Sequence, residues 1–171
     1  MKKIKIILGI ITLLTLAFFA TGSLIKETKY SVQVSVNKPI KDVFKKFNNI
    51  EDSKKWIPEI KTIETIKSNL GKIGNVYKIV IQNQDQEIKM TERVLAYVPN
   101  EKVTLFYDAE NMLKTNDYVF TEKDGVTQIV LKSTCRSDSY LMSCLFPYFK
   151  STFKEQDLSY LDNFKNFVEQ Q

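Results

Sequence analysis

The last stretch of this chain, from about Ser137 to Gln171, constrains its fold most, because apolar residues recur there at the spacing of one helical face. At 3.6 residues per turn the members of this stripe fall within roughly a third of a turn. They are Phe146, Phe149, Phe153, Tyr160, Leu161, Phe164, Phe167 and Val168. The spacing predicts a long amphipathic helix, with Pro147 at the start or a kink of its main run, since proline inside a helix loses a hydrogen bond. Such a face needs another element to cover it.

Two polar residues interrupt the stripe. Gln156 lies at its margin, and Asp157 lies within it, between Phe164 and Val168 on the helical wheel. A buried helix face rarely carries a carboxylate unless the site is wet or the charge is paired. Either the helix faces a cavity at this point, or Asp157 reaches a cavity mouth or a cationic partner.

An apolar segment near the N-terminus is the second constraint. From Ile6 to Ile25 about twenty residues carry no charge, which is enough to cross a hydrocarbon core of about 30 Å. Lys2, Lys3 and Lys5 precede it, so we expect a single-pass membrane protein with the N-terminus in the cytoplasm and the C-terminal domain outside. The alternative is a signal peptide cleaved near Gly22, with secretion of the remainder.

Composition favours one domain and excludes several functions. At 171 residues and 43% hydrophobic residues, the chain can bury one good core. Of the formal charge of +5, three come from the N-terminal lysines, so no basic face for nucleic acid is expected. The absence of histidine and the presence of only two cysteines argue against a metal site. No glycine-rich phosphate loop follows a strand, so no cofactor is expected. We expect an anchor or signal segment at residues 1–25, a tether at 26–29 and one domain at 30–171, whose oligomeric state the sequence leaves open.

The first part of the predicted domain is a strand followed by two short helices. Residues 30–36 alternate with β-branched side chains on one face, which predicts a strand. Pro39 then ends the strand and opens a helix over Ile40 to Phe47. A second short helix, about Glu51 to Trp56, ends before Pro58, which pushes the preceding residue to extended geometry.

The middle of the chain reads as six strands joined by turns. We expect strands at residues 60–66, 75–82, 87–97, 102–107, 113–120 and 126–135. The breaks at 71–74, 83–85, 99–100, 109–111 and 123–125 have residues suited to hairpins. Short consecutive connections favour an antiparallel meander. The predicted class is therefore α+β, with a seven-stranded antiparallel sheet covered by the C-terminal helix.

This order of elements resembles the START-like superfamily, also called SRPBCC, which has the helix-grip fold and includes polyketide cyclase-like and Bet v 1-like proteins. The resemblance covers about Tyr30 to Val168. It rests on the strand-to-helix block 34–44, the turn at 56–58, the hairpin entry at 71–74, the segment 92–94 with Pro99 downstream, and the terminal helix. The apolar N-terminal segment resembles that of a subset with a membrane anchor.

The resemblance implies a curved sheet wrapped around the long helix, with an apolar cavity between them for a lipid or another hydrophobic small molecule. In such a fold the apolar strand faces serve as core and as cavity wall at once. The residues expected to bind the ligand are Tyr77, Ile79, Met90, Glu92, Tyr107, Tyr118, Phe120, Phe149, Phe153, Gln156, Asp157 and Tyr160.

Two other functions remain open. If Met90 and Val94 face inward by period two, Glu92 faces inward too, opposite Asp157. The two acids could then form an acid/base pair of a polyketide cyclase or dehydratase. Alternatively, Glu92 pairs with a cation on a neighbouring strand. The other function is a non-catalytic interaction or stress-response module with a collapsed cavity.

Cys135 and Cys144 lie at the junction of the last strand and the C-terminal helix. Outside the cytoplasm they could form a disulfide. The alternative is that both are small buried hydrophobic residues.

Overall fold

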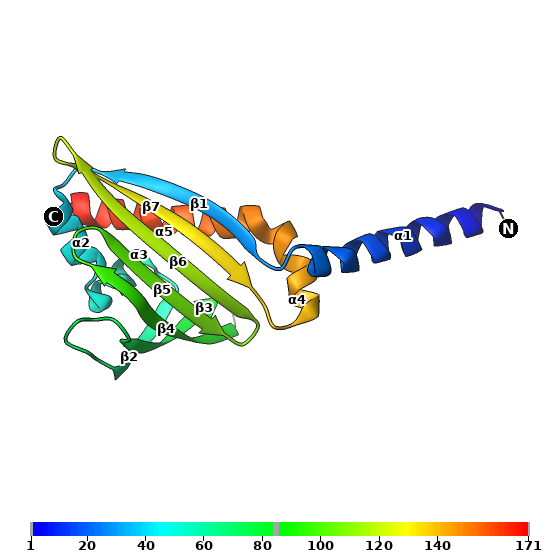
Figure 1. Cartoon of the computed structure of the whole chain (residues 1–171), viewed down its shortest axis with the longest axis horizontal. Helices are drawn as coiled ribbons and strands as arrows, with labels where there is room; N and C mark the ends of the chain where they lie inside the picture. The colour runs from blue at the N-terminus through cyan, green and yellow to red at the C-terminus, as the bar shows by residue number, and fades with distance from the viewer. Residues whose placement is uncertain (1, 84–85, 171) are drawn as a thin grey trace.

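The computed structural model describes residues 2–83 and 86–170. Seven antiparallel strands form one sheet in the order β1-β7-β6-β5-β4-β3-β2, so the first and last strands of the chain lie side by side (Figure 1). The strands are β1 (Thr28–Val36), β2 (Ile60–Lys67), β3 (Val76–Asn83), β4 (Gln86–Val98), β5 (Lys102–Ala109), β6 (Met112–Lys123) and β7 (Val126–Arg136). The predicted α+β class and the seven-stranded antiparallel sheet are confirmed.

Turn chemistry sets the register of this sheet. The hairpin between β6 and β7 has Asp124 at φ 53° and Gly125 at φ 76°, a pair of left-handed residues that suits a tight hairpin. The meander follows from such short connections. The turn expected at 83–85 lies, apart from Asn83, outside the described residues.

Helices precede the sheet, follow it, and lie between its strands β1 and β2. They are α1 (Lys2–Leu24), α2 (Ile40–Phe47), a 3-10 turn η1 (Ile50–Asp52), α3 (Ser53–Trp56), α4 (Tyr140–Leu145), a 3-10 turn η2 (Phe146–Phe149) and α5 (Lys150–Glu169). The helix expected between 137 and 171 is therefore divided. Pro147 lies in η2 and the main run begins just after it, because proline cannot supply the backbone N–H that a continuous helix would need.

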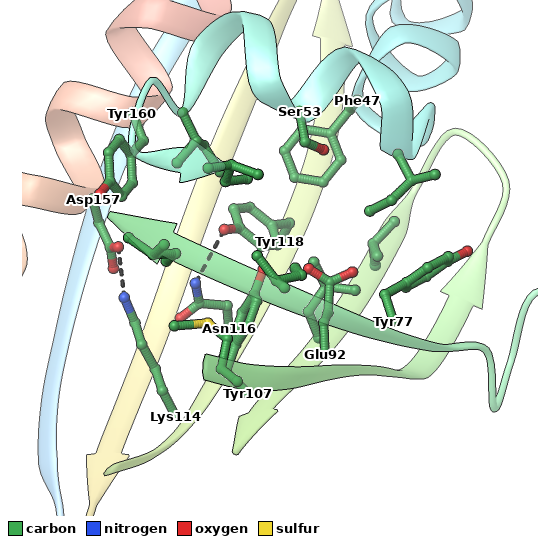
Figure 2. Close-up of a pocket in the computed structure, with 18 of the residues that line it drawn as sticks. Phe47, Ser53, Tyr77, Glu92, Tyr107, Lys114, Asn116, Tyr118, Asp157 and Tyr160 are labelled. Atoms are coloured by element: carbon green, nitrogen blue, oxygen red, sulfur yellow. Dashed lines mark hydrogen bonds and ion pairs between the residues drawn. The ribbon is translucent and has the colours of Figure 1, made fainter. Parts of the chain in front are cut away.

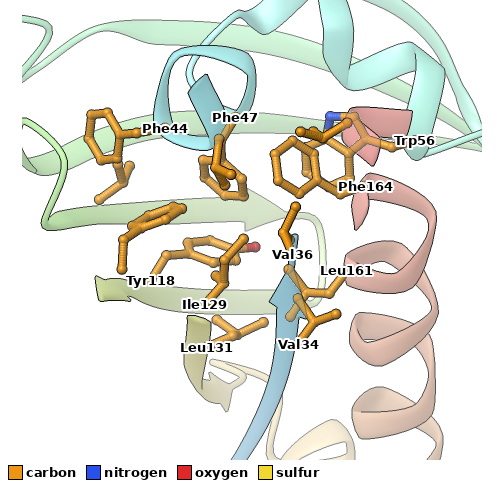
Figure 3. Close-up of a cluster of buried hydrophobic side chains, with 14 of the residues drawn as sticks. Val34, Val36, Phe44, Phe47, Trp56, Tyr118, Ile129, Leu131, Leu161 and Phe164 are labelled. Carbon is orange, nitrogen blue, oxygen red and sulfur yellow. The ribbon is translucent and has the colours of Figure 1, made fainter. Parts of the chain in front are cut away.

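The core forms where α5 and α2 meet the β1 side of the sheet. α5 packs along β1, and α2 packs on β6 and β7. Phe164 of α5 is fully buried between aromatic neighbours, with its ring centroid 5.3 Å from those of Phe47 and Trp56 (Figure 3). The apolar stripe predicted from the sequence is therefore buried against the β1 side of the sheet.

The N-terminal helix α1 projects from the end of the domain at which α4 lies (Figure 1). Among the described residues it is the helix whose length and composition allow it to cross a membrane. Residues 25–27 alone link it to β1, which begins at Thr28, inside the expected tether.

We predict that Phe164→Ala lowers the free energy of unfolding by about 3–5 kcal/mol, because it opens a cavity in a packed aromatic cluster. Chemical denaturation of the full chain in detergent micelles measures this change. The control is Leu158→Ala on the same helix, where a side chain that is 36% exposed should cost less than about 1 kcal/mol. Equal losses in the two variants would contradict the placement of the core.

Candidate functional site

A cavity of about 290 Å³ lies between the concave face of the sheet and the helices α3 and α5 (Figure 2). Its walls are mostly apolar side chains of β3, β4 and β5, such as Ile79, Val94 and Leu105. This volume is near the lower end of the range of about 300–1,000 Å³ that is typical of small-molecule pockets.

Most of the residues expected to bind a ligand line this cavity. They are Tyr77, Ile79, Met90, Glu92, Tyr107, Tyr118, Gln156, Asp157 and Tyr160. The period-two reading of β4 places Met90, Glu92 and Val94 on the cavity side, as expected, because the bulge in its pairing with β5 comes only after Val94. Whether these residues contact a ligand stays a prediction.

Three of the expected residues do not line the cavity. Phe120 shares a strand face with Tyr118 but is 2% exposed and packs under α2 against Phe44. Phe149 is 48% exposed, and Phe153 packs against Phe146 in a separate small cluster. Phe149 lies in the 3-10 turn η2, which breaks the helical phase before α5. Phe153 lies on α5 one turn before Asp157, at a level where the helix packs against Phe146 and not against the cavity.

The sequence reasoning missed several polar residues of the wall, among them Lys114 and Asn116 on β6. Both lie on β6 at even spacing before Tyr118. Period two would have placed them on the same face as Tyr118, had it been extended towards the start of the strand.

Asp157 lies within the apolar stripe of α5 as a buried carboxylate with charged and polar partners. Its side chain is 4% exposed, forms an ion pair with Lys114 (Nζ to Oδ1, 2.6 Å) and accepts a hydrogen bond from the Tyr30 hydroxyl (2.8 Å). It therefore has a cationic partner and lines the cavity as well (Figure 2). The pair connects α5 to β1 and β6.

Glu92, on β4, is the other buried acid that lines the cavity. The hydroxyl of Tyr107 donates a hydrogen bond to it, and burial raises the pKa of Glu92 to about 7. Burial and the charge of Glu92 raise the pKa of Tyr107 well above its usual value. Near neutral pH this carboxyl can therefore hold or release a proton, which an exposed glutamate cannot do.

A hydrogen-bonded chain fixes the polar part of the wall. Ser133 donates to the amide oxygen of Asn116 (2.8 Å), and the Asn116 amide nitrogen donates to the Tyr118 hydroxyl (3.1 Å). The Tyr118 hydroxyl is thus held in one orientation, from which it can donate to a bound molecule (Figure 2).

A second polar group lies on the α5 side of the cavity. Gln156 donates to the hydroxyl of Tyr160 (2.8 Å), and Tyr160 in turn hydrogen-bonds Glu59. Within the described residues, the indole N–H of Trp56 and one carboxylate oxygen of Glu59 are buried and lack a partner. Both residues line the cavity, but these two atoms themselves are covered by other protein atoms.

The two cysteines are both buried free thiols, so the disulfide alternative is not formed. Cys135 packs with Tyr30 and Phe146, and burial raises the pKa of its thiol. Cys144 instead faces α1 at Gly22. The two thiols therefore pack against different groups of residues.

Comparisons with known proteins show the fold. No family model and no curated protein matches the sequence. Among solved structures, Ara h 8.0201 superposes with a TM-score of 0.68 at 14% identity, over 85% of this chain and 99% of that one. The Zhui aromatase/cyclase from Streptomyces sp. R1128 has a TM-score of 0.72 at 12% identity, over 84% of this chain and 94% of that one.

A third similar structure is the Staphylococcus aureus protein of unknown function SA2116, with a TM-score of 0.67 at 14% identity, over 85% of this chain and 96% of that one. The chain therefore has the helix-grip fold, as the resemblance in its sequence predicted. At these sequence identities the structural similarity shows the fold but does not identify a ligand.

We predict that Glu92 makes the protein less stable as the pH rises from about 4.5 to about 7. The folded state keeps the proton over this window, and the unfolded state loses it, so the free energy of unfolding falls by a few kcal/mol and is constant above the window. Denaturant unfolding of the full chain in detergent at pH 5 and pH 8 measures the fall.

Glu92→Gln keeps a neutral side chain at every pH and should remove most of this dependence, while Glu64→Gln at an exposed position of β2 should retain it. A pH profile unchanged in Glu92→Gln would show that the carboxyl is ionised in the folded state.

Proposed function

We propose that this protein is a membrane-anchored domain that binds a hydrophobic small molecule or lipid in the cavity between the sheet and α5. The observation that carries this proposal is the cavity itself, about 290 Å³ of space with largely apolar walls inside a domain that is otherwise well packed. A folded chain seldom retains such a volume without a ligand to fill it.

The polar groups of the wall indicate an amphiphilic ligand. The hydroxyls of Tyr107 and Tyr118, the carboxyl of Glu92 and the amide of Gln156 belong to a mostly apolar wall. A ligand with an apolar body and a few hydroxyl or carbonyl groups would form hydrogen bonds with them, whereas a pure hydrocarbon would form none.

The anchor is supported by the N-terminal helix. α1 is apolar over a membrane-spanning length, and the lysines before it favour a cytoplasmic N-terminus with the domain outside. Its last turns pack on α4, where Gly22 lies against Cys144. Cleavage near Gly22 would remove most of this packing, so the contact favours retention of α1 over secretion.

We predict that the purified full chain binds apolar fluorescent probes and releases an apolar molecule that mass spectrometry can identify. Met90→Trp on β4 should weaken probe binding by at least about tenfold, or ~1.4 kcal/mol, because the indole fills the cavity. Leu95→Trp, at an exposed position of the same strand, is the control and should leave binding unchanged. Absence of probe uptake together with absence of a released molecule would refute the binding function.

An acid/base enzyme is the second candidate, and the raised pKa of Glu92 is the observation that favours it. A carboxyl that titrates near neutral pH is suited to proton transfer, and one protein of this fold is an aromatase/cyclase. Asp157 lines the same cavity, but Lys114 and Tyr30 already occupy its oxygens. Glu92 would therefore carry the proton, and Asp157 would mainly position Lys114.

We predict for this candidate that Glu92→Gln lowers turnover of a polyketide-like substrate by about 10²–10⁴-fold while the substrate still binds. Rates are compared with those of the exposed control Glu64→Gln and of Asp157→Asn. An undiminished rate in Glu92→Gln would eliminate Glu92 as the acid/base group.

A further inference from the structure

A second uncharged run lies between Asp138 and Lys150. The residues from Ser139 to Phe149 include no Asp, Glu, Lys or Arg, in a chain of which 26% is charged. They form α4 and η2, the elements that precede the main C-terminal helix. The cavity and the proposed binding function use none of these residues.

This run has a buried side and an apolar exposed side. Cys144 and Phe146 point inward, and Phe146 packs with Tyr30 and Cys135. The outer side consists of Tyr140, Leu141, Tyr148 and Phe149, which are between 48% and 59% exposed. We call these four side chains the outer face of α4–η2. Four large apolar side chains grouped on one short element usually mark an interaction surface.

The end of α1 lies against this element (Figure 1). The ring of Tyr140 stacks on Phe19 at 6.2 Å, and its hydroxyl donates to the Phe19 carbonyl oxygen at 2.6 Å. The ring of Tyr148 stacks on Phe18 at 6.1 Å. Gly22 permits the approach, since a Cβ there would lie 2.5 Å from the Cys144 sulfur.

These contacts set the depth of α4–η2 along α1. Phe18 and Phe19 precede Ile25, the last residue of the uncharged run, by six or seven positions. At 1.5 Å per residue they lie roughly 10 Å inside the outer end of that run. If this run fills the hydrocarbon core of a bilayer, side chains stacked on Phe18 and Phe19 lie roughly 10 Å below the boundary between headgroups and acyl chains.

We propose that the outer face of α4–η2 inserts into the outer leaflet of the membrane that α1 spans. This inference rests on the proposed anchor. Tyrosine rings are enriched at that boundary, and surface-bound amphipathic elements are typically buried about 5–10 Å into it. The occupant of the surface is thus a lipid bilayer, because α1 carries the surface to that depth.

Insertion is driven by apolar contact more than by charge. Near this face, Arg136 pairs with Asp138, and Glu27 pairs with Lys29. Lys26 and Lys150 remain beside it and would add about 1 kcal/mol each where the leaflet is anionic.

Insertion would hold the domain at two points and set the height of the cavity above the bilayer. Phe146, on the buried side of this element, belongs to the cluster that also contains Met112, and Met112 lines the cavity. The Met112 end of the cavity is therefore the end nearest the membrane.

The test uses tryptophan reporters in the full chain, reconstituted into phosphatidylcholine vesicles with or without brominated acyl chains. Leu141→Trp and, separately, Tyr148→Trp place an indole on the outer face. Leu70→Trp places one on the fully exposed loop between β2 and β3 as a control. The emission of the buried Trp56 is subtracted with the parent chain.

We expect brominated lipid to quench the emission of both outer-face reporters and to leave the emission of Leu70→Trp unchanged. Vesicle flotation distinguishes a failure of the proposed anchor from a failure of the proposed insertion. A chain that does not float with vesicles refutes the anchor. A chain that floats but shows no quenching at either reporter refutes the insertion alone, whether the face then lies in water or against a second copy.

Discussion

The mismatch in size between one helix and a seven-stranded sheet governs this structure. A helix is about 10 Å across, and neighbouring strands are about 4.8 Å apart, so α5 can cover only part of the concave face. It packs along β1, where Leu161 and Phe164 complete the core. The strands β3 to β5 are covered less closely, and the cavity is the space that remains beneath them.

The buried ion pair of Asp157 and Lys114 fixes one position of α5 on this partly covered sheet. Replacement of one partner would leave an uncompensated buried charge, which costs about 3–5 kcal/mol, so the pair fixes how α5 lies on the sheet. Tyr30 adds a hydrogen bond from β1 to the same carboxylate. The contacts of this one carboxylate therefore fix the position of α5 relative to β1 and β6. In that position Gln156 and Tyr160 line the cavity.

The sequence predicted the fold well, because period-two strands and turn residues such as Asp124-Gly125 are local signals. The same alternation places Tyr77, Glu92 and Tyr107 on the cavity wall, whereas Phe120 lies farther along β6, under α2. Phe149 lies outside the cavity because the 3-10 turn at Pro147 breaks the helical phase before α5, and Phe153 because it precedes the cavity by one turn of α5. The ion pair of Lys114 with Asp157 was missed because residues 43 positions apart meet only through tertiary packing.

The same proline also determines how the domain meets α1. Had the C-terminal helix continued unbroken past Pro147, its first turns would have extended away from the domain, and Phe146 could not have folded back onto Tyr30 and Cys135. The break turns α4 towards α1, so that Cys144 meets Gly22. A domain released from α1 would expose this contact surface beside Tyr140 and Tyr148, and such an apolar patch favours aggregation in water. Retention of α1 removes that cost, which is a physical reason for the domain to remain attached to this helix.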